Sequence, residues 1–337
     1  MKTGLSIPLI SAALAALCAC STAPMSAEDT AAVRVEVYRD SARVLFRDGA
    51  VPTVLATGYQ WSEGPLWIGE GDYLLFSDVP SNVIHRYVPG EGAAPWLTPS
   101  GATGLAPTDT AQGSNGLVLD PEGRLVLMQH GDRRVARMIA PLGEPAARFE
   151  TLVGEYDGRR LNSPNDAVYA RDGSLYFTDP PYGLAGIMED PHKALPFQGV
   201  YRLAPDRRLT LIDDSRTYPN GVALSRDEKT LYVAVSDEAF PHWARYAVAE
   251  DGTVSQPDVF FDARDLPPMP GLPDGMAMHS AGWLFATGPG GVFVFSERGE
   301  LAARIFTGRL TANCALSADE KTLYLTAHDA LMKLDLR

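Results

Sequence analysis

One short phrase occurs six times along the chain, and this repetition constrains the fold more than any other feature of the sequence. Each copy holds a polar residue, an apolar run, a turn and a second apolar run, as in SNGLVLDPEGRLVLMQH and PNGVALSRDEKTLYVAVSD. A repeat unit of about 40–55 residues with several short strands is typical of one blade of a β-propeller. The copies begin at Ser62, Ser114, Pro164, Pro219, Pro273 and Ala312.

The repeats predict an all-β fold, a six-bladed β-propeller with four antiparallel strands per blade, over residues 33–337. Turn sequences such as D-P-E-G at 120–123 separate the paired apolar runs, as in β-hairpins. The last copy supplies about three strands, whereas the apolar stretch Val51–Ala56 precedes the first copy and has no blade of its own. We expect this N-terminal stretch to be the outer strand of the sixth blade, which would close the ring and remove an exposed sheet edge.

The polar residue of each copy opens the innermost strand of its blade, and the innermost strands of a propeller line its central channel. We therefore expect these polar residues to form one ring at one end of the channel. A competing interpretation is that Asn-Gly and Pro-Asp-Gly sequences only form turns, and Asn115 and Asn313 are better explained as structural residues than as ligands. The ring residues are Glu63, Asn115, Asn165, Asn220, Asp274 and Asn313.

This ring combines two carboxylates with amide oxygens and contains no His or Cys. Such hard oxygen donors suit Ca²⁺, suit Mg²⁺ less well, and argue against copper or a typical Zn²⁺ site. The prolines before Asn165, Asn220 and Asp274 stiffen the entry to each strand. The sequence therefore predicts one divalent cation in the channel, with Ca²⁺ as the favoured ion and Mg²⁺, Mn²⁺ and Zn²⁺ as alternatives.

Four longer motifs lie within residues 62–280: SEGPLW, LNSPNDAVYARDGSLYFTDPPYG, PNGVALSRDEKTLYV and GLPDGMAM. Together they resemble the gluconolactonase, regucalcin and senescence-marker-protein family of metal-dependent lactonases, in its bacterial gluconolactonase-like branch. The resemblance implies that the chain hydrolyses a sugar lactone, such as glucono-1,5-lactone, to the aldonic acid. The repeat extends the similarity toward the C-terminal end.

The resemblance also implies roles for individual residues. Glu63, Asn220 and Asp274 would hold the cation. Asn165 would lie beside the cation. It is a candidate metal ligand and also a candidate catalytic residue that contacts the substrate. Animal members carry an arginine two residues before this asparagine, whereas this chain has Ser163 there. The substrate specificity of the animal enzymes therefore does not transfer to this chain.

In the expected reaction the cation polarises the lactone carbonyl and a water molecule attacks the carbonyl carbon. Asp274 is the candidate general base, because a carboxylate beside a cation can both bind the metal and accept a proton. His130 is a candidate proton shuttle or ring-opening acid, and the competing interpretation is a channel histidine bonded to the backbone. Asn115 and Tyr182 are further candidate substrate contacts.

Two long connections are candidate walls of the site, because long inserts on one face of a propeller often shape the substrate pocket. Tyr182 and the segment 184–197 would form a lid over the channel mouth. His242 and Trp243 would form a second wall. In both cases the competing interpretation is that these side chains only pack the loop against the body.

The remaining chemically reactive residues have structural explanations. Arg133 and Arg134 follow the candidate histidine, and we expect them to be solvated surface side chains rather than sugar contacts. Cys314 lies in the apolar stretch ANCAL. A buried inert thiol is a better explanation for it than a nucleophile.

The N-terminal segment has the features of an export signal. Residues 1–20 combine a positively charged start, the apolar stretch Leu5–Leu17 and the sequence LCAC, which predicts a signal peptide with a lipobox. Cleavage before Cys20 and acylation of its thiol would anchor the chain to a membrane, and a plain secretory signal is the alternative. Residues 21–32 are expected to be a flexible tether. We predict an exported, periplasmic, lipid-anchored protein, with the outer membrane favoured because Ser21 is not aspartate.

Charge limits the possible partners. The formal net charge is −13, and no basic stripe is interleaved with aromatic residues, so nucleic acid is excluded as an expected partner. The expected partner is a small-molecule lactone, membrane contact is expected only through a lipid on Cys20, and no obligate protein partner is evident. Two other functions stay open: a propeller hydrolase for other lactones or phosphotriesters, and a non-catalytic exported binding propeller with a structural metal.

Overall fold

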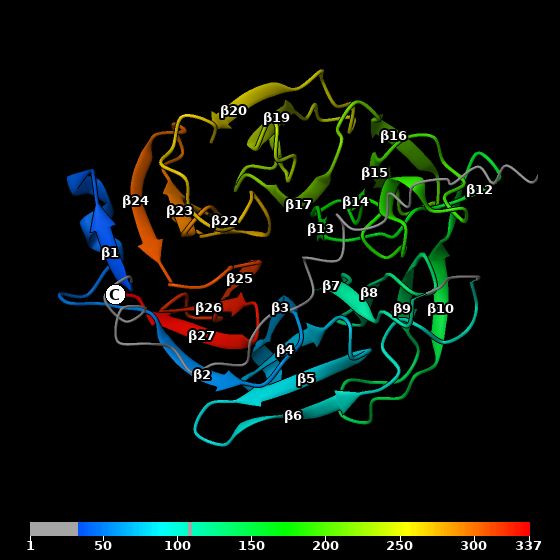
Figure 1. The fold of residues 1–337 in the computed structure, drawn as a ribbon, viewed down its shortest axis with the longest axis horizontal. Coiled ribbons are helices and arrows are strands. Elements are labelled where there is room, and N and C mark those ends of the chain that lie inside the picture. Colours follow the sequence, from blue (N-terminus) through cyan, green and yellow to red (C-terminus); the bar gives the residue numbers. More distant parts are fainter. Residues whose placement is uncertain (1–32, 107–109) are drawn as a thin grey trace, which may run out of the picture.

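Six sheets of four or five antiparallel strands surround a central axis (Figure 1). The computed structural model describes residues 33–106 and 110–337. The predicted six-bladed β-propeller is confirmed. The predicted signal peptide, the lipobox with Cys20 and the tether lie outside the described residues and stay predictions.

In the first three blades, the strands follow chain order within each sheet. Blade one contains β3 (Ser62–Ile68), β4 (Tyr73–Asp78), β5 (Val83–Val88) and β6 (Gly92–Leu97). Blade two contains β7 (Ser114–Leu119), β8 (Leu125–Gln129), β9 (Arg134–Met138) and β10 (Phe149–Val153). Blade three contains β13 (Ala167–Tyr169), β14 (Leu175–Asp179), β15 (Gly199–Leu203) and β16 (Leu209–Asp213). A short hairpin of β11 (Glu155–Tyr156) and β12 (Arg159–Arg160) connects blades two and three.

The last three blades complete the ring. Blade four contains β17 (Pro219–Leu224), β18 (Thr230–Val235), β19 (His242–Ala247) and β20 (Asp258–Asp262). Blade five contains β21 (Met276–Met278), β22 (Leu284–Gly288), β23 (Gly291–Phe295) and β24 (Leu301–Phe306). Blade six takes β25 (Asn313–Leu316), β26 (Thr322–Ala327) and β27 (Ala330–Asp335) from the C-terminal end of the chain.

Two N-terminal strands cover the edges of the last two blades. β2 (Thr53–Thr57) pairs with β27, with Thr53 opposite Lys333, and is the outer strand of blade six, as the sequence predicts. β1 (Arg34–Val37) pairs with β24 and adds a fifth strand to blade five, which the sequence analysis did not predict. All six blades are thus complete within the described residues, so the ring needs none of residues 1–32 to close.

The innermost strands share an irregularity where the polar residues lie. In β3, β7 and β17 the pairing with the second strand shifts register between Glu63 and Leu66, Ser114 and Leu117, and Pro219 and Val222. A bulge of this kind bends a strand and changes the direction of its side chains. In each of these strands, the side chain of the polar residue therefore does not follow the regular alternation between the two faces of the sheet.

Apolar residues fill the space between neighbouring blades. One core cluster joins Ile68, Leu75 and Ile84 of blade one to Leu117 and Leu127 of blade two, and all of them are at most 4% exposed. Equivalent clusters lie between the other blades. Burial of these faces stabilises each blade against its neighbours, so the ring stays closed around the channel.

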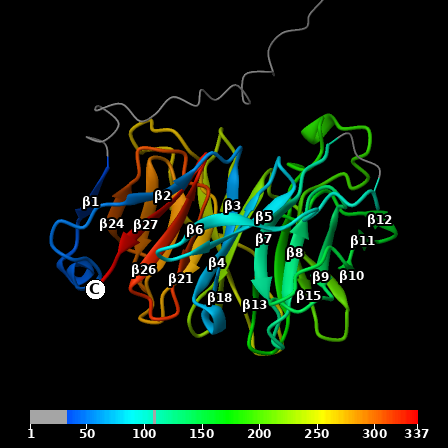
Figure 2. The same cartoon turned by 90° about the horizontal axis from the view of Figure 1, so that it is seen from below.

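The helices of the described residues are three short 3₁₀ segments, η1 (Asp40–Leu45), η2 (Gly69–Gly71) and η3 (Ile187–Glu189). In the described residues, none of these helices is long and apolar enough to cross a membrane. In the side view, the turn that contains η2 lies at one end of the channel, and the loop that contains η3 lies at the opposite end (Figure 2). The strands of the blades run between these two ends.

Candidate active site in the central channel

The innermost strands contact each other in the order β3, β7, β13, β17, β21, β25 and back to β3, and thus line the channel. The predicted ring residues lie within β3, β7, β17 and β25, or two residues before β13 and β21. Five of them are at most 6% exposed, and Asp274 is half-buried. We call these residues the channel ring: Glu63, Asn115, Asn165, Asn220, Asp274 and Asn313.

Four glycines follow directly after residues of the channel ring, and each allows two blades to approach closely. A Cβ atom added to any of them would lie 1.9–2.7 Å from an atom of the next ring residue along the chain. The Asn-Gly and Pro-Asp-Gly sequences therefore mark close packing of innermost strands, and the interpretation of these sequences as simple turns is wrong. The glycines are Gly64, Gly116, Gly221 and Gly275.

A chain of hydrogen bonds fixes the side-chain amides on one side of the ring. Asn165 Nδ2 donates to Asn220 Oδ1 at 2.5 Å, and Asn220 Nδ2 donates to Ser236 Oγ at 2.9 Å. Ser236 Oγ in turn donates to the Pro273 carbonyl at 2.6 Å, directly before Asp274. Ser236 was not predicted from the sequence, but it links blades four and five beneath two candidate metal ligands.

Burial and neighbouring carboxylates raise the pKa of both acidic residues of the ring. Burial, and after it the Asp166 carboxylate, raises the pKa of Glu63 to about 7, although Gly64 N donates to Glu63 Oε2 at 3.1 Å. Burial, and then the Glu63 and Asp166 carboxylates, raise the pKa of Asp274 well above its ordinary value. The structure thus brings Glu63 and Asp274 together, although they lie in blades one and five.

Asp166 is a third channel carboxylate that the sequence analysis missed. It occupies the position that is glycine in four other copies, and its carboxylate accepts hydrogen bonds from Ala167 N at 2.9 Å and Val222 N at 3.3 Å. Burial raises its pKa to about 6. The signal was present in the sequence, since the copy in blade three reads Asn-Asp where its neighbours read Asn-Gly.

The donors in the ring fit a divalent cation of the calcium type. Among the described residues, none of the ion pairs involves Glu63, Asp166 or Asp274, so buried negative charge gathers here without a cationic side chain. No three His, Cys, Asp or Glu side chains of the described chain form a metal cluster by themselves, so amide oxygens would complete the set. Asn220 Oδ1 is available on one side, whereas Asn165 would have to turn its amide to offer Oδ1.

His130 lies beside the ring and is neutral. Its side chain is 1% exposed, and burial lowers its pKa to about 3. Nδ1 lies 3.0 Å from Gln112 Oε1, which can only accept, so Nδ1 carries the hydrogen and Nε2 the lone pair. Nε2 has no hydrogen-bond partner among the described residues. The site therefore favours His130 as a proton acceptor or shuttle over a protonated ring-opening acid, and its partner is a side chain rather than the backbone.

Tyr182 and the loop after it are fastened over this end of the channel. The Tyr182 ring stacks on Tyr218 with centroids 5.8 Å apart, and burial raises the pKa of its hydroxyl. Gly183 N donates to Ser163 Oγ at 2.8 Å, and Thr110 Oγ1 donates to the Gly183 carbonyl at 2.9 Å. The segment 184–197 is thus held at its start by contacts from two other parts of the chain.

The comparison with protein families agrees with this channel. Residues 61–329 match the model described as the SMP-30/Gluconolactonase/LRE-like region. The chain belongs to this family. It is 37% identical over 293 residues to a gluconolactonase from Zymomonas mobilis, covering 83% of this chain and 80% of that protein. It is 26% identical over 239 residues to a pentonolactonase from Haloferax volcanii, covering 70% of this chain and 69% of that protein.

Solved structures support the same assignment to the SMP-30/gluconolactonase family. A gluconolactonase from Xanthomonas campestris superimposes with a TM-score of 0.75 at 30% identity, covering 90% of this chain and 95% of that chain. A calcium-binding regucalcin from Agrobacterium tumefaciens has a TM-score of 0.65 at 15% identity, covering 84% of this chain and 93% of that chain, and shows that the fold is shared.

Two arginines that the sequence analysis placed on the solvated surface are buried in the structure. Arg133 and Arg134 are only 1% and 7% exposed, so the prediction that they are solvated is wrong. Arg133 Nε lies 2.9 Å from both the Leu161 and Asn162 carbonyls, and Nη1 donates to the His192 carbonyl at 2.7 Å. The cause is the irregular backbone of the loops in blade three, whose carbonyls need buried donors.

Arg134 is buried among side-chain acceptors of blade two and of the turn before β9. Its Nε donates to Gln129 Oε1 at 2.6 Å, and Nη2 forms an ion pair with Asp132 at 3.0 Å. In the same segment, Ser163 Oγ donates to the Pro180 carbonyl at 2.5 Å. Ser163 therefore holds the turn at 180–183, and it does not present a charged group where animal members of the family have arginine.

The proposed second wall is part of the core. Trp243 is fully buried and packs its ring against Phe293 and Phe295 of blade five. His242 is 2% exposed and Nδ1 lies 2.8 Å from the Phe240 carbonyl. The interpretation that these two side chains only pack the loop is the one that the structure supports. Cys314 is buried, and burial raises the pKa of its thiol, as expected for an inert cysteine.

Proposed function

We propose that this protein hydrolyses a sugar lactone to the aldonic acid in the central channel, with one divalent cation bound by Glu63, Asn220 and Asp274 and with Asn165 beside it. The observation that carries this proposal is the group of buried or half-buried carboxylates at one end of the channel, which have no ion-pair partner among the described residues. Relatives named gluconolactonase and pentonolactonase support a sugar lactone as the substrate class. Ca²⁺ is the ion that this set of oxygen donors fits best.

The residues of the channel divide the chemical work. When bound, a divalent cation supplies a positive charge that polarises the lactone carbonyl. Asp274 accepts a proton from the attacking water, since a carboxylate beside the cation can both hold the metal and take up a proton. The new bond joins the water oxygen to the carbonyl carbon, the bond from that carbon to the ring oxygen breaks, and the proton ends on the released hydroxyl.

Three further residues contact the substrate in this proposal. His130 Nε2 accepts a hydrogen bond from a sugar hydroxyl or passes a proton, since its lone pair has no protein partner in the described chain. Asn165 and Asn115 offer amide groups to the hydroxyl groups of the ring. The Tyr182 ring covers the side of the channel near Ser236 and Asp274 and excludes water from it.

The test is hydrolysis of glucono-1,5-lactone and of a panel of apolar lactones and phosphotriesters by residues 33–337, which form the complete ring. The protein is stripped with EDTA and then assayed with Ca²⁺, Mg²⁺, Mn²⁺ or Zn²⁺. Glu63→Gln and Asp274→Asn are the test variants. Glu122→Gln is a matched control, because Glu122 is an exposed carboxylate paired with Arg124.

The outcomes separate the competing functions. Metal-dependent turnover of the sugar lactone that both channel variants lose supports the proposal. Faster turnover of apolar lactones or phosphotriesters would replace the substrate class but keep the site. A folded protein that binds metal, loses only melting temperature with EDTA and hydrolyses nothing on the panel would be a binding propeller with a structural metal.

We also propose that the chain is exported to the periplasm and anchored through a lipid on Cys20, with the outer membrane favoured. The signal-like residues 1–20 and the LCAC sequence support this location. Radiolabelled palmitate should enter the full chain expressed in a bacterium, and Cys20→Ser should abolish the label. A labelled Cys20→Ser chain, or an unlabelled wild type that is secreted in soluble form, would favour a plain secretory signal.

A further inference from the structure

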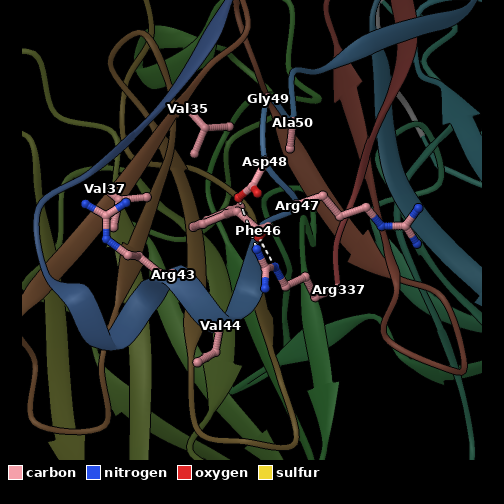
Figure 3. Close-up of a pocket in the computed structure, with 10 residues that line it drawn as sticks. All are labelled: Val35, Val37, Arg43, Val44, Phe46, Arg47, Asp48, Gly49, Ala50 and Arg337. Carbon is pink, nitrogen blue, oxygen red and sulfur yellow. Dashed lines mark hydrogen bonds and ion pairs between the residues drawn. The ribbon is translucent and has the colours of Figure 1, made fainter.

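A groove lies on the flank of the propeller, away from the channel. It is bounded by β1, η1, the segment 46–50 and Arg337, and its volume is about 480 Å³ (Figure 3). Val35, Val44 and Phe46 give it an apolar lining. Nothing in the proposed lactone chemistry uses this groove, because it is built from the outer strand of blade five and the helical turn after it.

One strongly exposed apolar side chain lines the same groove. Among the described residues, the large hydrophobic side chains with high exposure include Tyr38, Val44, Val51 and Val54, which fall within one short stretch of the chain. Val44, at 65% exposed, belongs to η1 and lines the groove itself. Single exposed apolar residues are ordinary, so Val44 counts here because it shares the groove with the apolar side chains of Val35 and Phe46.

The groove is also locally basic on an acidic protein. Three arginines and one aspartate line it, whereas the whole chain has a net charge of −13. Arg43 Nε and Arg337 Nη2 form ion pairs at 3.0 Å with Asp40 and 3.1 Å with Asp48, but each of these side chains is more than half exposed. Exposed pairs of this kind contribute little and exchange readily for other anions.

Arg47 is the arginine with the most freedom to bind an anion. Its Nε donates to the Leu336 carbonyl at 2.8 Å, and it has no ion pair with an acidic residue in the described part of the chain. Figure 3 shows the Arg43 and Arg47 side chains extending to opposite sides of the groove, with Arg337 between them. Guanidinium groups bind phosphate oxygens with two parallel hydrogen bonds, so each of these three arginines offers a site for one phosphate group.

We propose that this flank docks on an anionic phospholipid surface, with Arg43, Arg47 and Arg337 on lipid phosphates and Val44 inserted among the headgroups. The position of the groove supports this occupant. Twelve residues, 21–32, separate Cys20 from the first described residue, and a chain of that length reaches at most about 40 Å. If Cys20 is lipidated as proposed above, β1 and η1 stay close to the bilayer.

Docking on this flank leaves the active site accessible. In the side view, η1 lies on the outside of the ring toward the end with the hairpin turns, and the loop with η3 lies at the other end (Figure 2). The residues of the channel ring lie at, or just before, the N-terminal ends of the innermost strands. A protein held by its flank therefore keeps the mouth of the channel open to a diffusing lactone.

The test uses residues 33–337, which close the ring without the lipid, and measures co-sedimentation with vesicles. Phosphatidylglycerol mixed with phosphatidylethanolamine is compared with phosphatidylcholine. We expect binding to the anionic vesicles only, at least tenfold weaker in Arg43→Glu/Arg47→Glu, since each basic residue near an anionic surface contributes roughly fivefold. Val44→Asp should also weaken it. Arg208→Glu/Arg245→Glu, which changes two exposed arginines of blades three and four, is the matched control and should bind as wild type.

Other outcomes overturn the proposal. Equal binding to neutral and anionic vesicles is one such outcome, and binding that Arg43→Glu/Arg47→Glu leaves unchanged is another. Displacement from the vesicles by inorganic phosphate, but not by chloride at equal ionic strength, would indicate a discrete phosphate site instead. A dimer of residues 33–337 that dissociates in the double variant by light scattering would make the groove a contact between two copies. Melting temperature and lactone hydrolysis, measured on the same variants, should not change, so failure here is distinct from failure of the proposed function.

Discussion

The two ends of the innermost strands use acidic side chains in opposite ways. At the channel ring, Glu63, Asp166 and Asp274 are placed in the interior without ion-pair partners among the described residues. Burial raises the pKa of all three carboxyl groups, and neighbouring carboxylates raise the pKa of Glu63 and Asp274 further. This arrangement destabilises the protein unless a cation or protons neutralise the charge.

At the hairpin end, equivalent side chains join neighbouring blades. Glu228 accepts hydrogen bonds from the backbone N–H of Arg171 at 3.1 and 3.2 Å, and Glu320 accepts one from Ser280 N at 2.7 Å. Both glutamates are the E of the same S-x-D-E-K-T-L-Y sequence, which occurs in blades four and six. Glu228 also lies near the Arg171 guanidinium and Glu320 near the His279 ring, whereas the described ring carboxylates have no cationic side chain beside them. The difference teaches that burial without a cationic partner, rather than the presence of carboxylates, identifies the functional end of the channel.

The largest effect should follow from neutralising the ring. Asp274→Asn should lower kcat/KM for the sugar lactone by about 10³-fold, because it removes both a candidate ligand and the general base. In EDTA the same variant should melt no lower than wild type, because an unpaired buried charge is lost. Steady-state assays and thermal melts check both points. An active Asp274→Asn, or one that unfolds in EDTA well below wild type, would contradict the contrast between the two ends.

Stability of the metal-free protein should fall as the pH rises from about 4 to 7. Glu63 and Asp166 have folded-state pKa values of about 7 and 6, above their ordinary 4.5 and 3.8, so the native state binds more protons in this range. Glu63 alone would contribute about 3 kcal/mol of lost stability. Ca²⁺ should flatten this dependence, apart from a remainder due to Asp179, whose pKa burial raises to about 7 outside the ring.

Chemical denaturation in EDTA and in Ca²⁺ at several pH values measures this dependence. Glu63→Gln in EDTA should show a smaller pH slope than wild type. The same slope with and without Ca²⁺ would mean that the ring carboxylates do not face the cation.

The close packing of the ring can be tested with Gly275→Ala. An added Cβ would lie 1.9 Å from Asn313 Cγ, so we expect a loss of about 2–3 kcal/mol in the free energy of unfolding. Gly143→Ala is the control, because nothing lies within 4 Å of a Cβ there, and it should change stability by less than about 0.5 kcal/mol. Urea titration measures both, and equal stability of the two variants would show that the blades are not packed this tightly.

The smallest effect is expected at the hairpin end. Glu320→Gln keeps an acceptor for Ser280 N and loses only a partly exposed charge near His279, so stability should fall by about 0.5 kcal/mol. Lactone hydrolysis should stay at the wild-type rate. A large loss of activity in Glu320→Gln would mean that the two ends of the channel are coupled, and the comparison would need revision.

The repeat made the fold predictable because each copy carries the same alternation and turn residues. The position of β2 followed from counting, since blade six lacked one strand. β1 was not predicted because its four residues, RVEV, form a short alternating strand outside the repeats. No repeat or turn in the sequence indicates which strand it pairs with. Only the exposed edge of β24 in the folded ring selects that pairing.

In the site, the ring residues were predictable because each stands at the same place in a repeat. Asp166 was missed because Asn165, directly before it, had already been assigned as the polar residue of the third copy. Arg133 was predicted on the surface from its charge. Its burial depends on the carbonyls of 161–162 and 192, which are distant in sequence and come together only when blades two and three pack.

The pairing of β2 with β27 also governs when the chain can finish folding. The strand that completes blade six is β2, near the start of the described residues, whereas its partner β27 is the last strand of the described residues. Contacts between such distant segments form late and slowly. The ring therefore cannot close until β27 is available, so an incomplete chain that ends before β27 leaves β2 without its partner strand.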